Sequence, residues 1–197
     1  WPISFFSFED LRLFFSLVLI AISCIIMGAG IPTTATYIIL VAVAAPALAQ
    51  LGIEPLVAHF FVFYYGVLAD ITPPVALAAY AASGIAKSNP FKTGNTAFRL
   101  GIAKALVPFV FVYSPSLLLI TGEFQTNQLI ITLIGTLIGI ALIGIAFSGY
   151  WFRPLKKYEQ IIIGIGSLFF VAPGIKSMVF GFLIILPMLF LQFLKKN

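Results

Sequence analysis

The stretch that decides the fold reads Gly66-Val-Leu-Ala-Asp70-Ile-Thr72-Pro73-Pro74-Val-Ala-Leu77, in which a carboxylate and two prolines interrupt strongly apolar sequence. A charged residue at the centre of a membrane-spanning helix costs about 2.5–3.5 kcal/mol on insertion scales. A proline inside a helix costs about 3 kcal/mol and leaves a carbonyl without its donor. Because lipid cannot satisfy that carbonyl, we expect an interrupted helix whose irregular segment is buried in protein or lines a polar cavity.

The composition around this stretch is that of a membrane protein. Of the 197 residues, 61% are hydrophobic and 9% are charged, against roughly 25% charged residues in soluble domains. We therefore expect an all-α, polytopic membrane protein in contact with lipid. The net charge of +5 comes from short basic clusters between apolar runs, a distribution that sets membrane topology and does not indicate a nucleic-acid partner.

Upstream of the interruption, about forty residues between Arg12 and Glu54 carry no Asp, Glu, Lys, Arg or His. One membrane span takes roughly 20 residues, so this run is too long for a single helix. The segment Gly28-Ala-Gly30-Ile-Pro32-Thr33-Thr34 divides it into arms over about 12–27 and 35–50. Either two short helices cross fully or they form a re-entrant hairpin. The uncharged tip favours the hairpin, since a tip in bulk water usually carries charge.

The other apolar runs complete the predicted architecture. The first part, 1–120, comprises the hairpin (8–50), the broken helix (55–87), a basic interfacial stretch (91–104) and a span over 100–120 that is bent at Pro108 and Pro115. The second part, 121–197, comprises additional C-terminal transmembrane helices over about 128–149, 160–173 and 177–194.

Charge alternates between the predicted loops. The loops at 87–104, 150–158 and 195–197 are basic, whereas the turns at 51–55, 121–126 and 174–176 hold only Glu54, Glu123 and Lys176 as charges. By the positive-inside rule, the basic loops are predicted to be cytoplasmic. The hairpin then enters from the outer side, and two full crossings would give the same parity.

The segment Gly28–Thr34 is a candidate binding site. Its glycines, Gly28 and Gly30, allow a turn with exposed backbone groups beside Pro32, and Thr33 and Thr34 offer hydroxyl oxygens, which suit a hard cation such as Na⁺. The helix that begins at Thr34 would direct its positive end toward an anionic solute. The alternative is an ordinary interhelical turn with Thr33 or Thr34 as N-cap.

The interruption Asp70–Pro74 is a second candidate site. Asp70 is predicted to supply negative charge for a cation, to carry a proton or to orient the unwound backbone beside Pro73 and Pro74. Thr72 is the better candidate for a direct oxygen ligand. The alternative, a proline kink with Asp70 reaching to an interface, conflicts with its central position between Glu54 and Lys87.

Enzyme chemistry is not predicted. His59 and Asp70 lie eleven residues apart, which is about 16 Å along a helix and too far for direct cooperation. The sequence has no HExxH motif, no paired carboxylates at helical spacing and no nucleophile–base pair. His59 is expected to pack near the outer interface, and Arg99 with its neighbouring lysines to anchor the cytoplasmic side.

Gly28-Ala-Gly30-Ile-Pro32-Thr33-Thr34-Ala is followed downstream by Asp70-Ile-Thr-Pro-Pro-Val-Ala-Leu-Ala-Ala-Tyr-Ala-Ala-Ser-Gly-Ile-Ala. Together they resemble the large membrane subunit of tripartite ATP-independent periplasmic (TRAP) transporters, and the resemblance covers about residues 8–120. Dicarboxylate-type members usually continue Thr-Pro-Pro with Val-Gly-Leu-Asn. This chain has Val75-Ala76-Leu77-Ala78 there, which resembles the fused permeases served by TAXI-type binding proteins.

The resemblance implies an elevator-type secondary transporter with inverted repeats, each contributing a hairpin and an interrupted helix. Residues 1–120 would be the second repeat, half of a transport domain, with the first repeat upstream of Trp1. The resemblance also implies that the transporter takes up an organic anion, which a periplasmic solute-binding protein delivers. This uptake needs no cofactor and is driven by Na⁺ or, in some members, by H⁺. Further implied partners are the upstream half of the permease and a small membrane subunit or its fused equivalent, in a bacterial or archaeal cytoplasmic (inner) membrane.

A rival interpretation is a non-transporting structural membrane subunit that scaffolds a complex through its small-residue helices. In that case the Thr-Pro-Pro interruption is only a bend, and the segment Gly28–Thr34 is insensitive to sodium.

Overall fold

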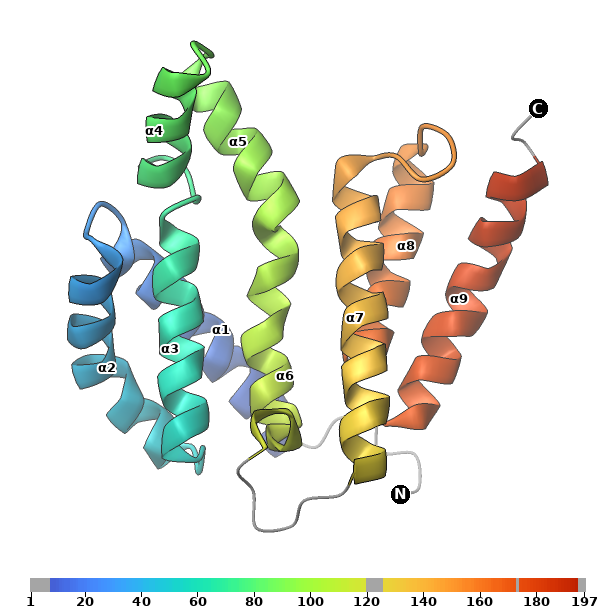
Figure 1. Cartoon of the computed structure of the whole chain (residues 1–197). Coiled ribbons are helices and arrows are strands. Elements are labelled where there is room, and N and C mark those ends of the chain that lie inside the picture. The colour runs from blue at the N-terminus through green and yellow to red at the C-terminus, as the bar shows by residue number, and fades with distance from the viewer. Residues whose placement is uncertain (1–7, 120–125, 173, 195–197) are drawn as a thin grey trace. The chain divides into compact units, whose positions relative to one another are not determined.

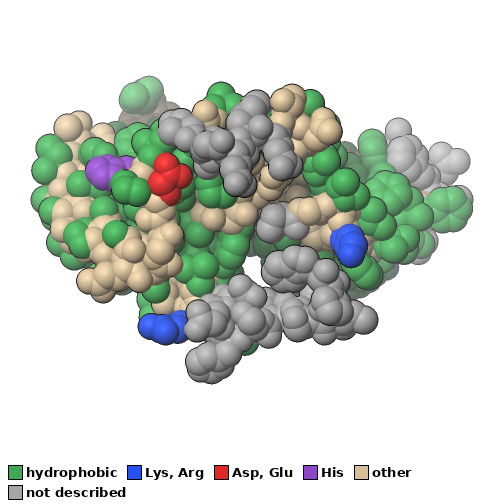
Figure 2. Space-filling view, turned by 90° about the horizontal axis from the view of Figure 1, so that it is seen from below, with side chains coloured by type: hydrophobic (Ala, Val, Ile, Leu, Met, Phe, Trp, Pro, Cys, Tyr) green, Lys and Arg blue, Asp and Glu red, His purple; other side chains and the backbone are tan. Residues whose placement is uncertain are grey.

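The computed structural model describes residues 8–119, 126–172 and 174–194, which are helical without a β-sheet. Within these residues, five helices are long and apolar enough to cross a membrane: Leu11–Gly28, Thr33–Gln50, Pro90–Tyr113, Thr126–Ser148 and Ile175–Gln192. The all-α, multi-span prediction is thus confirmed. Figure 2 agrees, since hydrophobic side chains cover much of the visible face and charged ones occur singly. The turn predicted at Glu123 lies outside the described residues.

The chain divides into two compact units, Trp1–Ala97 and Phe98–Asn197. In the first, α1 (Phe8–Gly28) and α2 (Thr33–Gln50) form a helical hairpin that packs on α3 (Pro55–Ala69). The two predicted arms lie within α1 and α2. Large apolar side chains of all three helices form the buried face: Leu17, Leu40, Leu48, Val57, Phe61 and Val62. The opposite faces are also apolar, as expected for helices that contact lipid.

The predicted interruption of the third helix is present. Helix α3 begins at Pro55, where the fixed φ of proline suits the first helical position. It ends at Ala69, and α4 (Leu77–Ile85) follows. Glu54 occupies the N-cap position, but its side chain makes no capping hydrogen bond.

The next helical path differs in its start from the predicted span over 100–120. Helix α5 (Pro90–Gly101) leads through a 3-10 segment, η1 (Ile102–Leu106), into α6 (Val107–Tyr113). The basic stretch is therefore continuous with the helix that follows it, in one candidate span, Pro90–Tyr113. The physical reason is a start signal: Asn89 Oδ1 accepts a hydrogen bond from the Lys92 amide at 3.0 Å, and Pro90 occupies the first position. The place of the basic stretch at the membrane interface stays a prediction.

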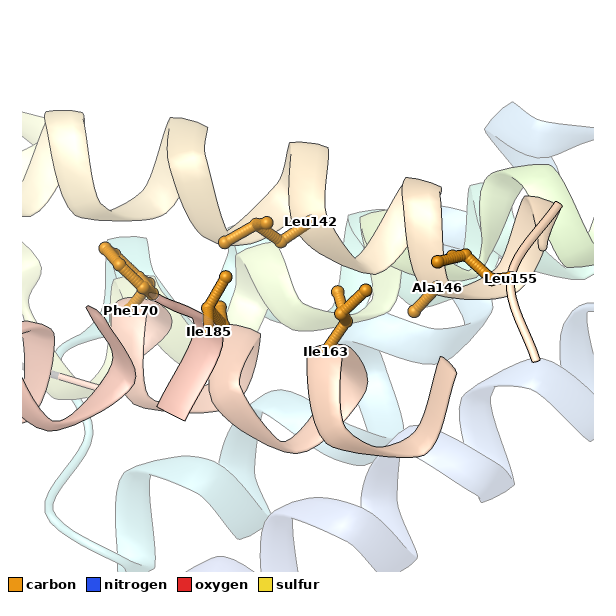
Figure 3. Packing of buried hydrophobic residues seen from close by; sticks show 6 residues of the cluster. All are labelled: Leu142, Ala146, Leu155, Ile163, Phe170 and Ile185. Carbon is orange, nitrogen blue, oxygen red and sulfur yellow. The ribbon is translucent and has the colours of Figure 1, made fainter. Parts of the chain in front are cut away.

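In the second unit, α8 (Lys157–Val171) packs against both α7 (Thr126–Ser148) and α9 (Ile175–Leu194). These helices match the spans predicted over 128–149, 160–173 and 177–194. Their core contains side chains from all three helices and from the α7–α8 loop: Leu142, Ala146, Leu155, Ile163, Phe170 and Ile185 (Figure 3). Gly139 and Gly181 permit close approach, since a Cβ on either would lie within about 3.1 Å of an α8 carbonyl oxygen.

A buried ion pair lies where α8 begins. The Glu159 carboxylate is 1% exposed and accepts hydrogen bonds from Arg153 at 2.6 and 3.2 Å and from the Lys156 amide at 2.8 Å. Gln192 of α9 also donates to it, at 3.4 Å. Burial acts to raise the pKa of Glu159, but the hydrogen bonds from Arg153 and Lys156 and their positive charges outweigh it and hold that pKa below its ordinary value.

Candidate functional site

The turn between α1 and α2, which we call the tip (Gly28–Thr34), is built on glycine. Helix α1 ends at Gly28, and Gly30 has a φ of 84°, a conformation that L side chains rarely adopt. Two backbone hydrogen bonds close the turn, from the Ala29 amide to Ile26 O at 3.3 Å and from the Ile31 amide to Gly28 O at 3.4 Å. The tip therefore reverses the chain within a few residues.

At the end of the tip, neither threonine caps α2. The N-cap is Pro32, no side chain makes a capping hydrogen bond, and Thr33 begins the helix. The interpretation of Thr33 or Thr34 as N-cap is therefore wrong, because the helix starts one residue earlier than a threonine cap requires. Both side chains are exposed in this chain, so their hydroxyls remain available at the positive end of α2.

The segment between α3 and α4, which we call the break (Asp70–Ala76), is irregular but well bonded. The amides of Asp70, Ile71 and Thr72 donate to carbonyls three residues earlier, which tightens the end of α3. The Thr72 hydroxyl donates to Leu68 O at 2.7 Å, and its lone pairs can still accept. Ala76 is fully buried with a φ of 40°, a strained conformation for alanine.

Helices α4 and α5 hold the break from the other side. The Tyr80 hydroxyl of α4 donates to Pro74 O at 2.6 Å, and the Ala78 amide donates to Asp70 O at 3.1 Å. Gly94 of α5 lies against the Tyr80 ring, because a Cβ on Gly94 would stand 2.8 Å from Tyr80 Cε1. The break is thus fixed by a tyrosine hydroxyl and by a helix that approaches closely.

The tip and the break lie against each other. A Cβ on Gly30 would stand 3.5 Å from Val75 Cγ1 in the break, and one on Gly28 would stand 3.1 Å from the Cβ of Ala69, the last residue of α3. Figure 1 shows the α1–α2 turn beside the junction of α3 and α4. The tip therefore contacts the residues on either side of the predicted segment Asp70–Pro74, through glycines and apolar side chains. Within residues 8–119, no hydrogen bond joins Thr33 or Thr34 to the break.

Asp70 is half-buried at the start of the break, and within the described residues it forms no ion pair. The same residues contain no cluster of three or more His, Cys, Asp or Glu side chains that could hold a metal ion. A cation here would therefore take hydroxyl and carbonyl oxygens as ligands, with Asp70 as the nearby negative charge, a donor set that suits a hard monovalent ion better than a transition metal.

His59 belongs to a different place. Its Nδ1 lies 2.8 Å from the Tyr37 hydroxyl, in a groove of about 440 Å³ lined also by Pro55, Leu56 and Phe63. This pair joins α2 to α3.

Sequence reasoning missed three residues that contact the tip or the break. They are Tyr80, Gly94 and Thr36, whose hydroxyl donates to Ile31 O of the tip. Tyr80 follows Pro74 by six residues, and such a tyrosine after a proline pair was a usable signal. The contact of Gly94 with Tyr80 joins two helices, and no local pattern predicts it.

Comparison with known proteins identifies a family. A family model described as "DctM: Tripartite ATP-independent periplasmic transporter, DctM component" matches residues 7–126, which include the tip and the break. No curated protein and no solved structure matches the chain.

Proposed function

We propose that this chain, which belongs to the DctM family of tripartite ATP-independent periplasmic transporters, binds a coupling cation where its tip meets its break. The family is that of the large membrane subunit, so the chain is a transporter permease component in a membrane. Our proposal adds that the permease takes up an organic anion, driven by an ion gradient, with Na⁺ as the coupling ion.

One observation carries the proposal: two irregular backbone segments lie against each other in one compact unit. Neither segment continues the regular hydrogen-bond pattern of an α-helix. Unpaired backbone groups are costly in lipid and are found at such depth where they line a site. A break that served only as a bend would not need a second irregular segment at the same level. Discontinuous helices that meet in this way form ion and solute sites in secondary transporters.

The proposed roles follow from the chemistry of the two segments. Thr33, Thr34 and Thr72, with nearby backbone carbonyls, supply oxygen ligands for the cation. Asp70 adjusts the local potential in favour of a positive charge. The first amides of α2 lie at the positive end of the helix dipole and favour the anionic substrate.

The position of the tip supports a re-entrant hairpin, because the tip lies against the interruption between α3 and α4 and not at an end of the path that they form. The 15 residues of α3 reach the break, and α4 continues beyond it for a further 9 residues. The tip contacts the break at Val75 and lies beside the middle of this interrupted path (Figure 1). We therefore propose that the tip stops inside the membrane, as the hairpin of a second inverted repeat in an elevator-type transporter.

The proposed partners rest on the family and, for the binding protein, on the resemblance of Val75–Ala78 to permeases served by TAXI-type proteins. They are a periplasmic solute-binding protein of the TAXI type that delivers the substrate, a matching first repeat, and a small membrane subunit or its fused equivalent. The proposed location is the cytoplasmic membrane of a bacterium or archaeon.

The test is stabilisation by sodium. The full-length protein is purified, and its unfolding midpoint is measured in rising NaCl against choline chloride at equal ionic strength. A ligand that binds only the folded state stabilises it by about 2.7 kcal/mol at 100 times its Kd. We expect Na⁺ to raise the midpoint, and Thr72→Val to weaken apparent Na⁺ affinity about tenfold or more, since a contact to a charge contributes about 1.5–3 kcal/mol. Asp70→Asn is expected to act in the same direction.

The matched control is Thr96→Val. The Thr96 hydroxyl donates to Lys92 O at 2.9 Å, the same contact four residues back that Thr72 makes with Leu68. It lies on α5, outside the tip and the break, so its substitution should leave Na⁺ stabilisation unchanged. Equal Na⁺ responses in the original protein and in the Thr72 and Asp70 variants would refute the proposed site.

A further inference from the structure

Thr36 lies where the three helices around the tip cross. It is a residue of α2 and is 1% exposed. Its methyl carbon, Cγ2, would stand 3.0 Å from a Cβ on Gly28 of α1 and 3.1 Å from a Cβ on Gly66 of α3. Two helices thus present glycine to the same methyl group, and this close fit fixes the position of the Thr36 side chain.

The hydroxyl of Thr36 is directed at the tip. It donates to Ile31 O at 3.1 Å, while the Thr36 amide donates to Pro32 O at 2.9 Å. Two successive carbonyls of the tip are therefore held by one residue. Within residues 8–119, this is the only side-chain hydrogen bond to the tip backbone.

We propose that Thr36 is a positioning residue for the ion site: its methyl group is anchored between α1 and α3, and its hydroxyl sets the Ile31 carbonyl and with it the conformation of the tip. The inference rests on the proposed function, because it assigns a residue that controls the cation site without being exposed to it. Gly30 gives the tip backbone additional conformational freedom, and the hydrogen bond from Thr36 restricts that freedom.

The consequence is a predicted effect on ion affinity. If only a fraction of molecules has the tip in its binding conformation, the apparent dissociation constant rises by the inverse of that fraction. Thr36→Val keeps the shape and the buried methyl contacts but removes the donor to Ile31 O. A neutral hydrogen bond is worth about three- to tenfold in such an equilibrium. We expect the half-saturating Na⁺ concentration to rise by about that factor.

The experiment uses a cysteine in the tip of the full-length protein. Cys24, the only cysteine among the 197 residues, is 1% exposed and is replaced by alanine in all variants. Ala29→Cys is then labelled in membranes with a soluble thiol reagent, and the labelling rate is measured against NaCl, with choline chloride at equal ionic strength. Sodium binding is expected to slow labelling. The same titration is repeated with Thr36→Val, Thr36→Ser and Thr36→Ala.

The serine variant separates the hydroxyl from the methyl group. Thr36→Ser keeps the donor and should stay within about twofold of the parent in half-saturating Na⁺, whereas valine and alanine should both shift it. If valine prevents folding, the serine–alanine pair makes the same comparison. Thr136→Val is the control, since Thr136 is a buried threonine whose hydroxyl makes no hydrogen bond among the described residues.

The outcomes distinguish this inference from the function it rests on. Labelling of the Ala29→Cys parent that ignores sodium overturns the proposed ion site. A sodium-sensitive parent with an unshifted valine or alanine variant overturns the role of Thr36 alone. A serine variant shifted as far as alanine also overturns it, because packing of the methyl group then explains the effect.

Discussion

At the scale of single residues, close approach between segments depends on positions that lack a side chain. Gly28 and Gly66 leave room for the Thr36 methyl group, and Gly94 leaves room for the Tyr80 ring. In each case a Cβ would stand about 3 Å or less from a neighbouring side-chain atom. The geometry of the tip and of the break therefore depends on the absence of a Cβ atom at these glycines.

Gly94→Ala is expected to destabilise the first unit relative to Gly84→Ala. A Cβ at position 94 must displace the Tyr80 ring, whose hydroxyl is bound to Pro74 O. Gly84 lies on α4, and a Cβ there would meet nothing within 4 Å, so its substitution gains helix propensity without a clash. The difference should be about 1–3 kcal/mol, measured as free energy of unfolding in detergent. Equal stabilities would show that Tyr80 moves freely and does not hold the break.

At the scale of elements, helix starts are set by local chemistry and helix interruptions by proline. Asn89 and Pro90 begin α5. Pro108 has no N–H to donate to Lys104 O, and that carbonyl instead accepts from Val107, which produces the 3-10 segment before α6. In the second unit, the first turn of α8 depends on Glu159 and the groups that it binds.

The Glu159 contacts predict a pH dependence of stability. Because its native pKa lies below the ordinary value, its stabilising effect is complete above the ordinary glutamate pKa and is lost as the pH falls through the native pKa. We expect the unfolding midpoint to fall with pH on the acidic side. Glu159→Gln should lower stability at neutral pH by about 1–3 kcal/mol and should flatten this part of the profile.

The control for this pH effect is Glu54→Gln, which removes an exposed carboxylate that caps nothing. Its acid profile should follow that of the original protein. A Glu159→Gln profile with the same acid slope as the original would mean that other groups cause the loss of stability.

At the scale of the whole molecule, each unit can be compared separately with the alternation of basic and acidic loops that predicts membrane sidedness. In the first, α3, the break and α4 make one path from the acidic turn at Glu54 to the basic turn at Lys87. In the second, the hydrogen bond from Gln192 to Glu159 places the last turn of α9 beside the basic α7–α8 loop. Both agree with the predicted alternation of charge.

Sidedness is tested with two cysteines in the Cys24→Ala background. Glu54→Cys and Ser88→Cys lie in exposed turns at the two ends of this path. An impermeant thiol reagent added to intact spheroplasts should label position 54, while position 88 should react only after permeabilisation, because basic loops stay cytoplasmic. Labelling of both from outside would contradict a single interrupted crossing, and the reverse pattern would invert the topology.

The sequence alone was sufficient for the class of protein, the approximate helices, the interruption at Asp70 and the family. Composition, proline and charge act locally, so their effects can be read from neighbouring residues. Only the tertiary structure decided that the tip touches the break, that Tyr80 and Gly94 fix the break, and that Thr36 holds the tip. The contacts of Gly30 with Val75, of Gly66 with Thr36 and of Gly94 with Tyr80 join separate elements. Their energies come from how closely helix surfaces fit, which no local pattern encodes. The hydrogen bonds of Tyr80 and Thr36 span only six and five residues, but their donors are positioned by these contacts between elements.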